Sequence, residues 1–283
     1  MHSYSMGPDQ QEKYYSRAWT FYRHALTILQ KQQVPFLVGG TYALEQYTGI
    51  RRNTKDLDIF VMPKDCNRVL EELTTAGYQT ELPDPQWLGQ VICGDDFIDV
   101  IFGPGNGITP VDEIWFEHAV EGNILDTPVK LCAPEEIIWP KAFIMDRKHY
   151  DGADIAHLLR TCSERINWSR LLHRFGPHWR VLLSHLILFG FIYPGERSRI
   201  PDWIMQELLD RVQNELSRPN PADRLCLGPF LSETEYLADI EHWGYQDARL
   251  IEQEPQDQAK YCDLPLLPNH ALWSKPFSGS MQN

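Results

Sequence analysis

The sequence predicts an α+β fold with α/β-like alternation: a mixed sheet flanked by helices, followed by a helical domain. Two observations predict it. Before residue 134, short apolar runs bounded by turn residues alternate with segments whose apolar residues recur every three or four positions. After residue 134 the helical spacing continues and the strand-like runs cease. The first pattern is typical of strands and helices in turn, and the second of helices alone.

The first half of the chain is expected to supply one long helix and the sheet. Tyr14, Phe21 and Leu29 belong to a helical repeat that opens the chain. Gly49 and Gly77 are expected to end two later helices, because glycine readily adopts the left-handed conformation found there. The expected helices are 9–32, 41–48, 64–76 and 111–120, and the expected strands are 36–38, 56–61, 78–81, 87–93, 97–102 and 124–131.

The second half is expected to be helical. Pro134 suits the first turn of a helix, and the negative charges of Glu135 and Glu136 suit its N-terminal dipole. The expected helices are about 134–145, 151–162, 167–174, 178–191 and 201–216. The expected units are a sheet domain 1–133 that includes the N-terminal helix, a helical domain 134–251, and a proline-rich tail 252–283 that packs on the body.

Length and composition bound the class of protein. The 283 residues, 43% of them apolar and 23% charged, are enough for one large domain or two ordinary ones. The six cysteines include no CxxC pair, so we expect no zinc site and a reducing, cytoplasmic compartment. The N-terminus does not resemble a signal peptide. The apolar run 181–193 is too short to cross a bilayer, so we expect a buried helix and no membrane contact.

The charge is uneven along the chain. The net charge of −13 argues against binding nucleic acid over a broad surface. Residues 141–180, however, hold eight Lys or Arg against four acids. This segment is either a basic wall for a polyphosphate or an ordinary solvated helix face, and the sequence favours neither.

The stretch from Val34 to Val61 carries the strongest chemical signal. An apolar run ends in Gly39-Gly40, and glycine lets the backbone of a strand–helix turn approach a phosphate at the helix N-terminus. Asp56 and Asp58 then alternate with Leu57 in a strand, so both carboxylates share one face. Such a pair is relieved by a divalent cation, and oxygen ligands suit Mg²⁺. The alternative is an acidic pair that caps strand ends.

Asp99 is the expected third carboxylate of this site. It is the one charge within the apolar run 97–102, and a charge at such a position needs a partner. A neighbouring strand would bring it beside Asp56 and Asp58 as a further metal ligand. The alternative is a buried ion pair with Arg51 or Arg52.

Together, Gly39-Gly40, Asp56-x-Asp58 and the later strand residue Asp99 resemble the nucleotidyltransferase superfamily typified by DNA polymerase beta. The run from Arg52 to Asp58, and then Lys141, Arg147 and Asp154, resemble its small bacterial AbiEii/MenT-like branch. The resemblance covers roughly residues 34–159. It implies a nucleotidyltransferase catalytic domain at 1–133, with the helical domain completing the nucleotide cleft.

The resemblance also implies roles for single residues. Gly39, Gly40, Thr41, Arg52 and Lys141 are expected at the triphosphate. Thr41 has the alternative of capping its helix, and Arg52 that of an ion pair with a surface acid. Lys141 lies on a largely apolar helix and needs an anion, which is either phosphate or a carboxylate such as Asp154 or Glu136. Asp154 is expected to orient Lys141 or Arg147, with a surface acid as the alternative.

The function expected from this pattern is transfer of an NMP from an NTP to a hydroxyl, with release of pyrophosphate. Asp56, Asp58 and Asp99 would hold two Mg²⁺ ions, with Mn²⁺ as a substitute. The acceptor is a tRNA, a protein or a small molecule, and a toxin-like role would add an antitoxin protein as a partner. The alternative function is a catalytically weak sensor or scaffold that binds nucleotide.

Overall fold

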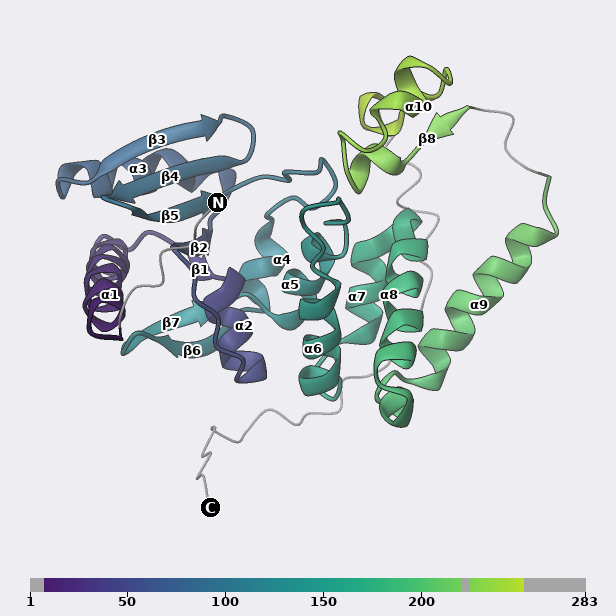
Figure 1. Ribbon diagram of the computed structural model, residues 1–283, viewed down its shortest axis with the longest axis horizontal. Helices are drawn as coiled ribbons and strands as arrows, with labels where there is room; N and C mark the ends of the chain where they lie inside the picture. Colours follow the sequence, from purple (N-terminus) through teal and green to yellow (C-terminus); the bar gives the residue numbers. More distant parts are fainter. Residues whose placement is uncertain (1–7, 220–223, 252–283) are drawn as a thin grey trace.

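The computed structural model describes the backbone of residues 8–219 and 224–251, and side chains from residue 17 onward. The predicted packing of tail 252–283 lies outside the described residues. In Figure 1 the large sheet with helix α1 occupies one side of the molecule, and helices α5 to α9 occupy the other. A small segment that contains β8 and α10 lies above these helices.

The large sheet is mixed, as the sequence predicts. Its seven strands follow the order β3-β4-β5-β2-β1-β7-β6. The central strand β2 runs parallel to β5 and antiparallel to β1, while β1 runs parallel to β7. The strands are β1 (Leu37–Val38), β2 (Asp56–Phe60), β3 (Gln79–Asp84), β4 (Leu88–Cys93), β5 (Asp96–Ile101), β6 (Val120–Ile124) and β7 (Thr127–Leu131). The parallel pairing of β2 and β5 brings residues from distant parts of the sequence together.

Helices pack around the sheet and then form a layer of their own. Helices α1 and α3 pack together, with α3 on β3 and β4, whereas α2 lies between β2 and α6. The helices of the first half are α1 (Pro8–Lys31), α2 (Gly40–Thr48), α3 (Cys66–Thr75) and α4 (Glu113–Glu117). Those that follow are α5 (Pro134–Lys141), α6 (Gly152–Cys162), α7 (Trp168–Phe175), α8 (Trp179–Ile192), α9 (Asp202–Leu216) and α10 (Leu237–Glu241). Helix α2 therefore connects the metal-binding candidates in β2 to the helical layer.

Several element ends follow local sequence signals. Gly49 ends α2 with φ 72°, and its N–H donates to the Glu45 carbonyl, as predicted. Pro134 begins α5, and Glu135 and Glu136 lie in its first turn. Helix α5 stops at Lys141, earlier than the predicted residue 145, and Pro140 lies in its last turn. The chain between Lys141 and α6 is consequently a loop that lies beside the site described below.

The prediction was wrong for residues 111–131. The expected strand 124–131 contains the end of β6, a turn at Leu125 and Asp126 with φ 52° and 59°, and then β7, so it spans part of a hairpin, β6–β7. The expected helix 111–120 shortens to α4, because the Asp112 side chain caps it and Val120 pairs with Leu131 as a strand. The turn carries no Asn-Gly or Asp-Gly pair, which is the usual sequence signal of such a hairpin.

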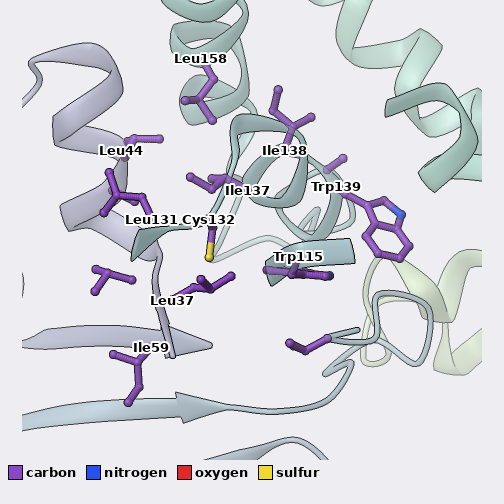
Figure 2. Close-up of a cluster of buried hydrophobic side chains, with 14 of the residues drawn as sticks. Leu37, Leu44, Ile59, Trp115, Leu131, Cys132, Ile137, Ile138, Trp139 and Leu158 are labelled. Carbon is purple, nitrogen blue, oxygen red and sulfur yellow. The ribbon is translucent and has the colours of Figure 1, made fainter. Parts of the chain in front are cut away.

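One continuous apolar core joins the sheet to the helices (Figure 2). Leu37 and Ile59 from the sheet lie in the same cluster as Ile138 from α5 and Leu158 from α6. All four are almost fully buried. Since the core crosses residue 133, the division into a sheet domain and a helical domain remains a prediction.

One helical stretch is long and apolar enough by composition to cross a membrane, namely Trp168–Ile192 with mean hydropathy 1.2. It consists of two helices, α7 and α8, separated by the 3-10 turn Gly176–His178. Each helix is shorter than the roughly 20 residues that a bilayer requires. Phe175 and Phe189 are fully buried inside the molecule, so one side of each helix packs in the core.

The small segment after residue 223 contains β8 (Leu225–Cys226) and β9 (Gln246–Asp247), which pair in parallel. It contacts the loop after α5, because the Met145 N–H donates to the Leu231 carbonyl at 3.3 Å. Arg147 in the same loop pairs with Glu235 at 2.6 Å. This segment therefore supports the loop through both contacts.

Candidate functional site

Asp56, Asp58 and Asp99 come together in the structure. Asp58 on β2 is the register partner of Asp99 on the parallel neighbour β5, and Asp56 shares the face of Asp58 two residues earlier. One carboxylate oxygen from each residue lies within 4.8 Å of the others. All three side chains are half-buried. The cluster therefore depends on strand register, which brings the third acid to the first two.

The contacts of these carboxylates leave them without a basic partner. The Thr54 hydroxyl donates to Asp56 Oδ1, and Gln90 Nε2 donates to Asp99 Oδ1 at 2.8 Å. The alternative ion pair of Asp99 with Arg51 or Arg52 does not form. Arg51 pairs with Glu45 and Arg52 with Asp154 instead. Within residues 17–219 and 224–251, no Lys, Arg or His forms an ion pair with any of the three carboxylates.

The electrostatics of the cluster fit a bound cation. Burial, followed by the charges of Asp56 and Asp99, raises the pKa of Asp58 to about 7. Burial and the charge of Asp56 also raise the pKa of Asp99, although the hydrogen bond from Gln90 acts in the other direction. Both shifts reflect burial of the carboxylates and repulsion between their like charges. Because the donors are all oxygens, the residues fit Mg²⁺ or Mn²⁺ better than softer metals.

The two glycines place the start of α2 directly against Asp58. The Gly39 N–H donates to the Asp58 carbonyl at 3.0 Å. Gly40 has φ 54°, and a Cβ on it would lie 1.6 Å from Asp58 Oδ2. A Cβ on Gly39 would lie 2.3 Å from the Phe60 ring. The free N–H groups of the first helical turn thus lie beside the carboxylate cluster. There they would donate hydrogen bonds to a phosphate bound to a cation at this cluster.

Thr41 lies in this first turn. The N-cap of α2 is Gly39, and no side chain caps the helix. The alternative that Thr41 serves as the helix cap is therefore wrong. Its hydroxyl remains a candidate for a phosphate contact.

A second charged cluster links Lys141, Asp151, Asp154 and Arg52. Lys141 Nζ lies 2.6 Å from Asp151 Oδ2 and 2.9 Å from Asp154 Oδ2. Arg52 also pairs with Asp154, and only 5% of the surface of Asp154 is exposed. The surface-acid alternative for Asp154 is therefore wrong. Of the two partners expected for it, the structure selects Lys141, and Arg147 pairs elsewhere.

This second cluster acts electrostatically on the first. The positive charge of Lys141 lowers the pKa of Asp58, and the negative charge of Asp151 raises it. Burial alone would lower the pKa of Lys141, but Asp151 and Asp154 outweigh burial and raise it. Lys141 is therefore a protonated, half-buried cation close to the carboxylates of β2. Asp151 was not among the predicted site residues, although its position three residues before Asp154 on the expected helix 151–162 placed it on the same helix face.

Neither of the two interpretations of residues 141–180, the basic wall or the solvated helix face, holds for two of the arginines. The side chains of Arg170 and Arg174 are only 14% and 6% exposed. Arg170 pairs with Glu135 at 2.7 Å, and Arg174 with Asp112 at 2.6 Å. These arginines join α7 to α5 and α4 inside the molecule, so they present neither a phosphate wall nor a solvated face.

Comparison with known proteins gives fold-level neighbours. No family model matches the chain, and no curated protein matches it. Among solved structures, the chain is similar to the antibiotic-resistance factor ANT(2'')-Ia, with 17% identity over 60% of this chain and 97% of that one, at a TM-score of 0.44. An antigenic nucleotidyltransferase-like protein from Paracoccidioides brasiliensis is 16% identical over 64% of this chain and 91% of that one, also at 0.44.

A third solved structure is the lincosamide antibiotic adenylyltransferase LnuA with lincomycin bound. It is 18% identical over 50% of this chain and 94% of that one, at a TM-score of 0.37. Similarity at this level does not assign an activity. The function proposed next depends on the geometry of the site.

Proposed function

We propose that this chain is a metal-dependent nucleotidyltransferase that moves an NMP from an NTP to a hydroxyl of an acceptor and releases pyrophosphate. One observation carries the proposal. Carboxylate oxygens of Asp56, Asp58 and Asp99 lie within 4.8 Å of one another, beside a helix N-terminus that only glycine can bring so close. The first feature suits divalent cations and the second suits a phosphate, and a nucleoside triphosphate binds both.

In this proposal Asp56 and Asp58 hold two Mg²⁺ ions and Asp99 holds one of them, with Mn²⁺ as a substitute. When bound, such ions stabilise the charge that develops on the attacking and leaving oxygens. The residues themselves set the geometry. Strand register fixes the three acids, and the hydrogen bonds from Thr54 and Gln90 orient Asp56 and Asp99. Preorganised groups of this kind account for most of the catalysis in phosphoryl transfer.

The remaining site residues position the triphosphate. Gly40 and Thr41 offer backbone N–H groups, and Gly39 lets this turn approach the carboxylates, while Lys141 and Arg52 supply positive charge. Asp154 pairs with both Lys141 and Arg52, and so holds the two cations near each other. In the reaction, a bond forms between the acceptor oxygen and the α-phosphorus, and the bond from the α-phosphorus to pyrophosphate breaks. Asp99 assists removal of the hydroxyl proton.

The same proposal includes the branch of the superfamily, the location of the protein and the acceptor. The sequence pattern around Asp58 and Lys141 supports the AbiEii/MenT-like branch and, with it, a toxin-like role with an antitoxin partner. The six cysteines without a CxxC pair support a cytoplasmic location. The acceptor is a tRNA, a protein or a small molecule. One solved structure of ANT(2'')-Ia is a complex with adenylyl-2''-tobramycin and that of LnuA is bound to lincomycin, so small molecules are among the acceptors to test.

The test is to incubate the purified chain with α-labelled NTP, Mg²⁺ and cell extract, and to identify which fraction becomes labelled. We expect Asp56→Asn and Asp58→Asn each to abolish labelling while the melting temperature stays equal or rises, because each change relieves like-charge repulsion. Asp126→Asn is the matched control, since the Asp126 side chain is 91% exposed and far from the site in sequence. Near wild-type labelling by either site variant would overturn the metal assignment.

Binding can be tested apart from turnover. A ligand that binds the native state raises the melting temperature by mass action. We expect NTP with Mg²⁺ to stabilise the parent strongly and NTP with EDTA to stabilise it far less. Stabilisation by Mg²⁺–NTP without any labelling would instead indicate a nucleotide sensor. The absence of any stabilisation would contradict both functions.

A further inference from the structure

Tyr150 is an exposed aromatic residue at the edge of the site that none of the roles above uses. It lies in the loop between α5 and α6, and 51% of its surface is exposed. The next residue in the chain is Asp151, which pairs with Lys141. Consecutive Cα atoms are about 3.8 Å apart, so the backbone of Tyr150 lies directly beside this ion pair.

The Tyr150 ring is held in place despite its exposure. Its backbone forms a bridge with Met145, which closes the loop. Its ring lies nearly parallel to the His185 ring, with an interplanar angle of 16° and centroids 6.3 Å apart. His185 is itself fixed, since it is 3% exposed and its Nε2 forms a hydrogen bond with the Ala142 carbonyl at 3.0 Å. An ordered backing of this kind keeps an exposed ring in one orientation.

Gly152 gives the ring the space it occupies. A Cβ on Gly152 would lie 2.2 Å from the Cζ and Oη atoms of Tyr150. The ring therefore packs directly on Gly152, the first residue of α6, and Asp154 of the same helix contacts Lys141 and Arg52. The start of α6 thus joins the ring to these ion pairs.

The ion pair of Lys141 with Asp151 interacts electrostatically with the carboxylate cluster. The charges of Lys141 and Asp151 both act on Asp58. In the proposed function Lys141 binds the triphosphate, so the nucleoside attached to that triphosphate would lie near the same ion pair. A rigid, half-exposed aromatic ring is what stacks on a nucleobase, because every base has a π-face and stacking does not require matching hydrogen bonds.

We propose that the base of the nucleoside triphosphate stacks on Tyr150, and that this contact makes the site prefer purine over pyrimidine triphosphates. The preference follows because a purine covers more of the ring. The inference depends on the proposed function, since it takes the triphosphate position from Lys141.

The experiment measures equilibrium binding to the full chain by calorimetry with Mg²⁺. The probes are a non-hydrolysable ATP analogue, the matching CTP analogue and inorganic tripolyphosphate, which has phosphates but no base. The variants are Tyr150→Ala, which removes the ring, and Tyr150→Phe, which keeps it. Phe191→Ala is the matched control, because Phe191 is an exposed aromatic on α8 with 82% of its surface accessible.

We expect Tyr150→Ala to weaken binding of the ATP analogue roughly 5- to 150-fold, the range that one base–aromatic stack provides. Binding of tripolyphosphate should stay the same, the loss for the CTP analogue should be smaller, and Tyr150→Phe and Phe191→Ala should bind like the parent. Equal binding of the ATP analogue by Tyr150→Ala and the parent would overturn the inference alone. An equal loss for tripolyphosphate, or an equal loss in Tyr150→Phe, would also overturn it. If the parent binds no triphosphate, the proposed function fails together with it.

Discussion

Gly40 lies so close to Asp58 that no other residue fits at its position. Its φ of 54° is in the left-handed region, and a Cβ there would meet the whole Asp58 side chain, at 1.6 Å from Oδ2 and 2.9 Å from Cβ. Asp58 is a short side chain with little freedom to move away. Gly49 at the other end of the same helix also has a positive φ, of 72°, but a Cβ there would meet nothing within 4 Å.

These two glycines allow a matched prediction. Gly49→Ala should cost about 1–2 kcal/mol, because it introduces only backbone strain. Gly40→Ala should cost a further ~1–3 kcal/mol from overpacking and should also reduce stabilisation by Mg²⁺–NTP, since it displaces Asp58, a proposed metal ligand. Urea unfolding at equilibrium, with and without Mg²⁺–NTP, measures both effects. Equal losses in the two variants would show that the start of α2 does not press on Asp58.

At the scale of elements, buried charges connect α5 and α7 with the segment that begins α4. The cluster holds three acids, Asp112, Glu135 and Glu136, against two bases, Arg170 and Arg174. Glu136 is fully buried. Its burial, despite the two arginines, raises its pKa to about 7. A proton retained on Glu136 would bring the cluster to neutrality, which gives this shift a physical reason.

A buried acid with a raised pKa makes stability depend on pH. Between pH 4.5 and about 7, Glu136 stays protonated in the folded state, whereas the same residue is ionised in the unfolded state. The contribution of Glu136 to stability is therefore full below pH 4.5 and is lost as the pH rises through 7, by an amount on the order of 1–3 kcal/mol. Asp58 titrates in the same range, so the variant must be compared with the parent at each pH.

We expect Glu136→Gln to remove this part of the pH dependence. The variant should gain stability relative to the parent as the pH rises from 5 to 8, and Glu117→Gln, an exposed change on α4, should follow the parent. Denaturant unfolding at several pH values measures the difference. If the difference between Glu136→Gln and the parent stays constant over this range, Glu136 is ionised throughout.

At the scale of the whole molecule, the segment after residue 223 packs against the helical layer and supports the residues that follow Lys141. Phe230 is 5% exposed and packs edge-on against His178, with ring centroids 5.2 Å apart. His178 in turn contacts Phe143, two residues after Lys141, at 5.8 Å between centroids. A chain of buried rings therefore runs from this segment to the residues that follow α5.

Removal of one ring should weaken ligand binding at the site. We expect Phe230→Ala to destabilise the protein by about 3–5 kcal/mol and to weaken Mg²⁺–NTP binding, because the support of the loop after Lys141 is lost. Leu216→Ala, at a position 82% exposed, should change stability by less than about 0.5 kcal/mol. Thermal melts and calorimetry measure the two quantities. An unchanged melting temperature in Phe230→Ala would mean that the segment docks only loosely.

Much of the fold was predictable from local patterns. Alternation in the run around Leu57 and Ile59 predicts a strand with Asp56 and Asp58 on one face, and Gly49 predicts the end of α2. The hairpin β6–β7 was missed because its turn, Leu125-Asp126, carries no glycine, so eight continuous residues resembled one strand. Pairing between strands overrode the local preference there.

The sequence by itself determined which groups are available: three acids in strand patterns, two glycines at a strand–helix turn, and a lysine on an apolar helix. These depend on periodicity and on the conformations each residue allows, which are local properties. Only the tertiary structure decided the partners. It paired Lys141 with Asp151 and Asp154, hydrogen-bonded Gln90 to Asp99, and buried Arg170 and Arg174 instead of exposing them. The physical reason is that a charge takes the counter-charge that folding brings within about 4 Å, and that distance depends on strand register and helix packing between residues far apart in the sequence.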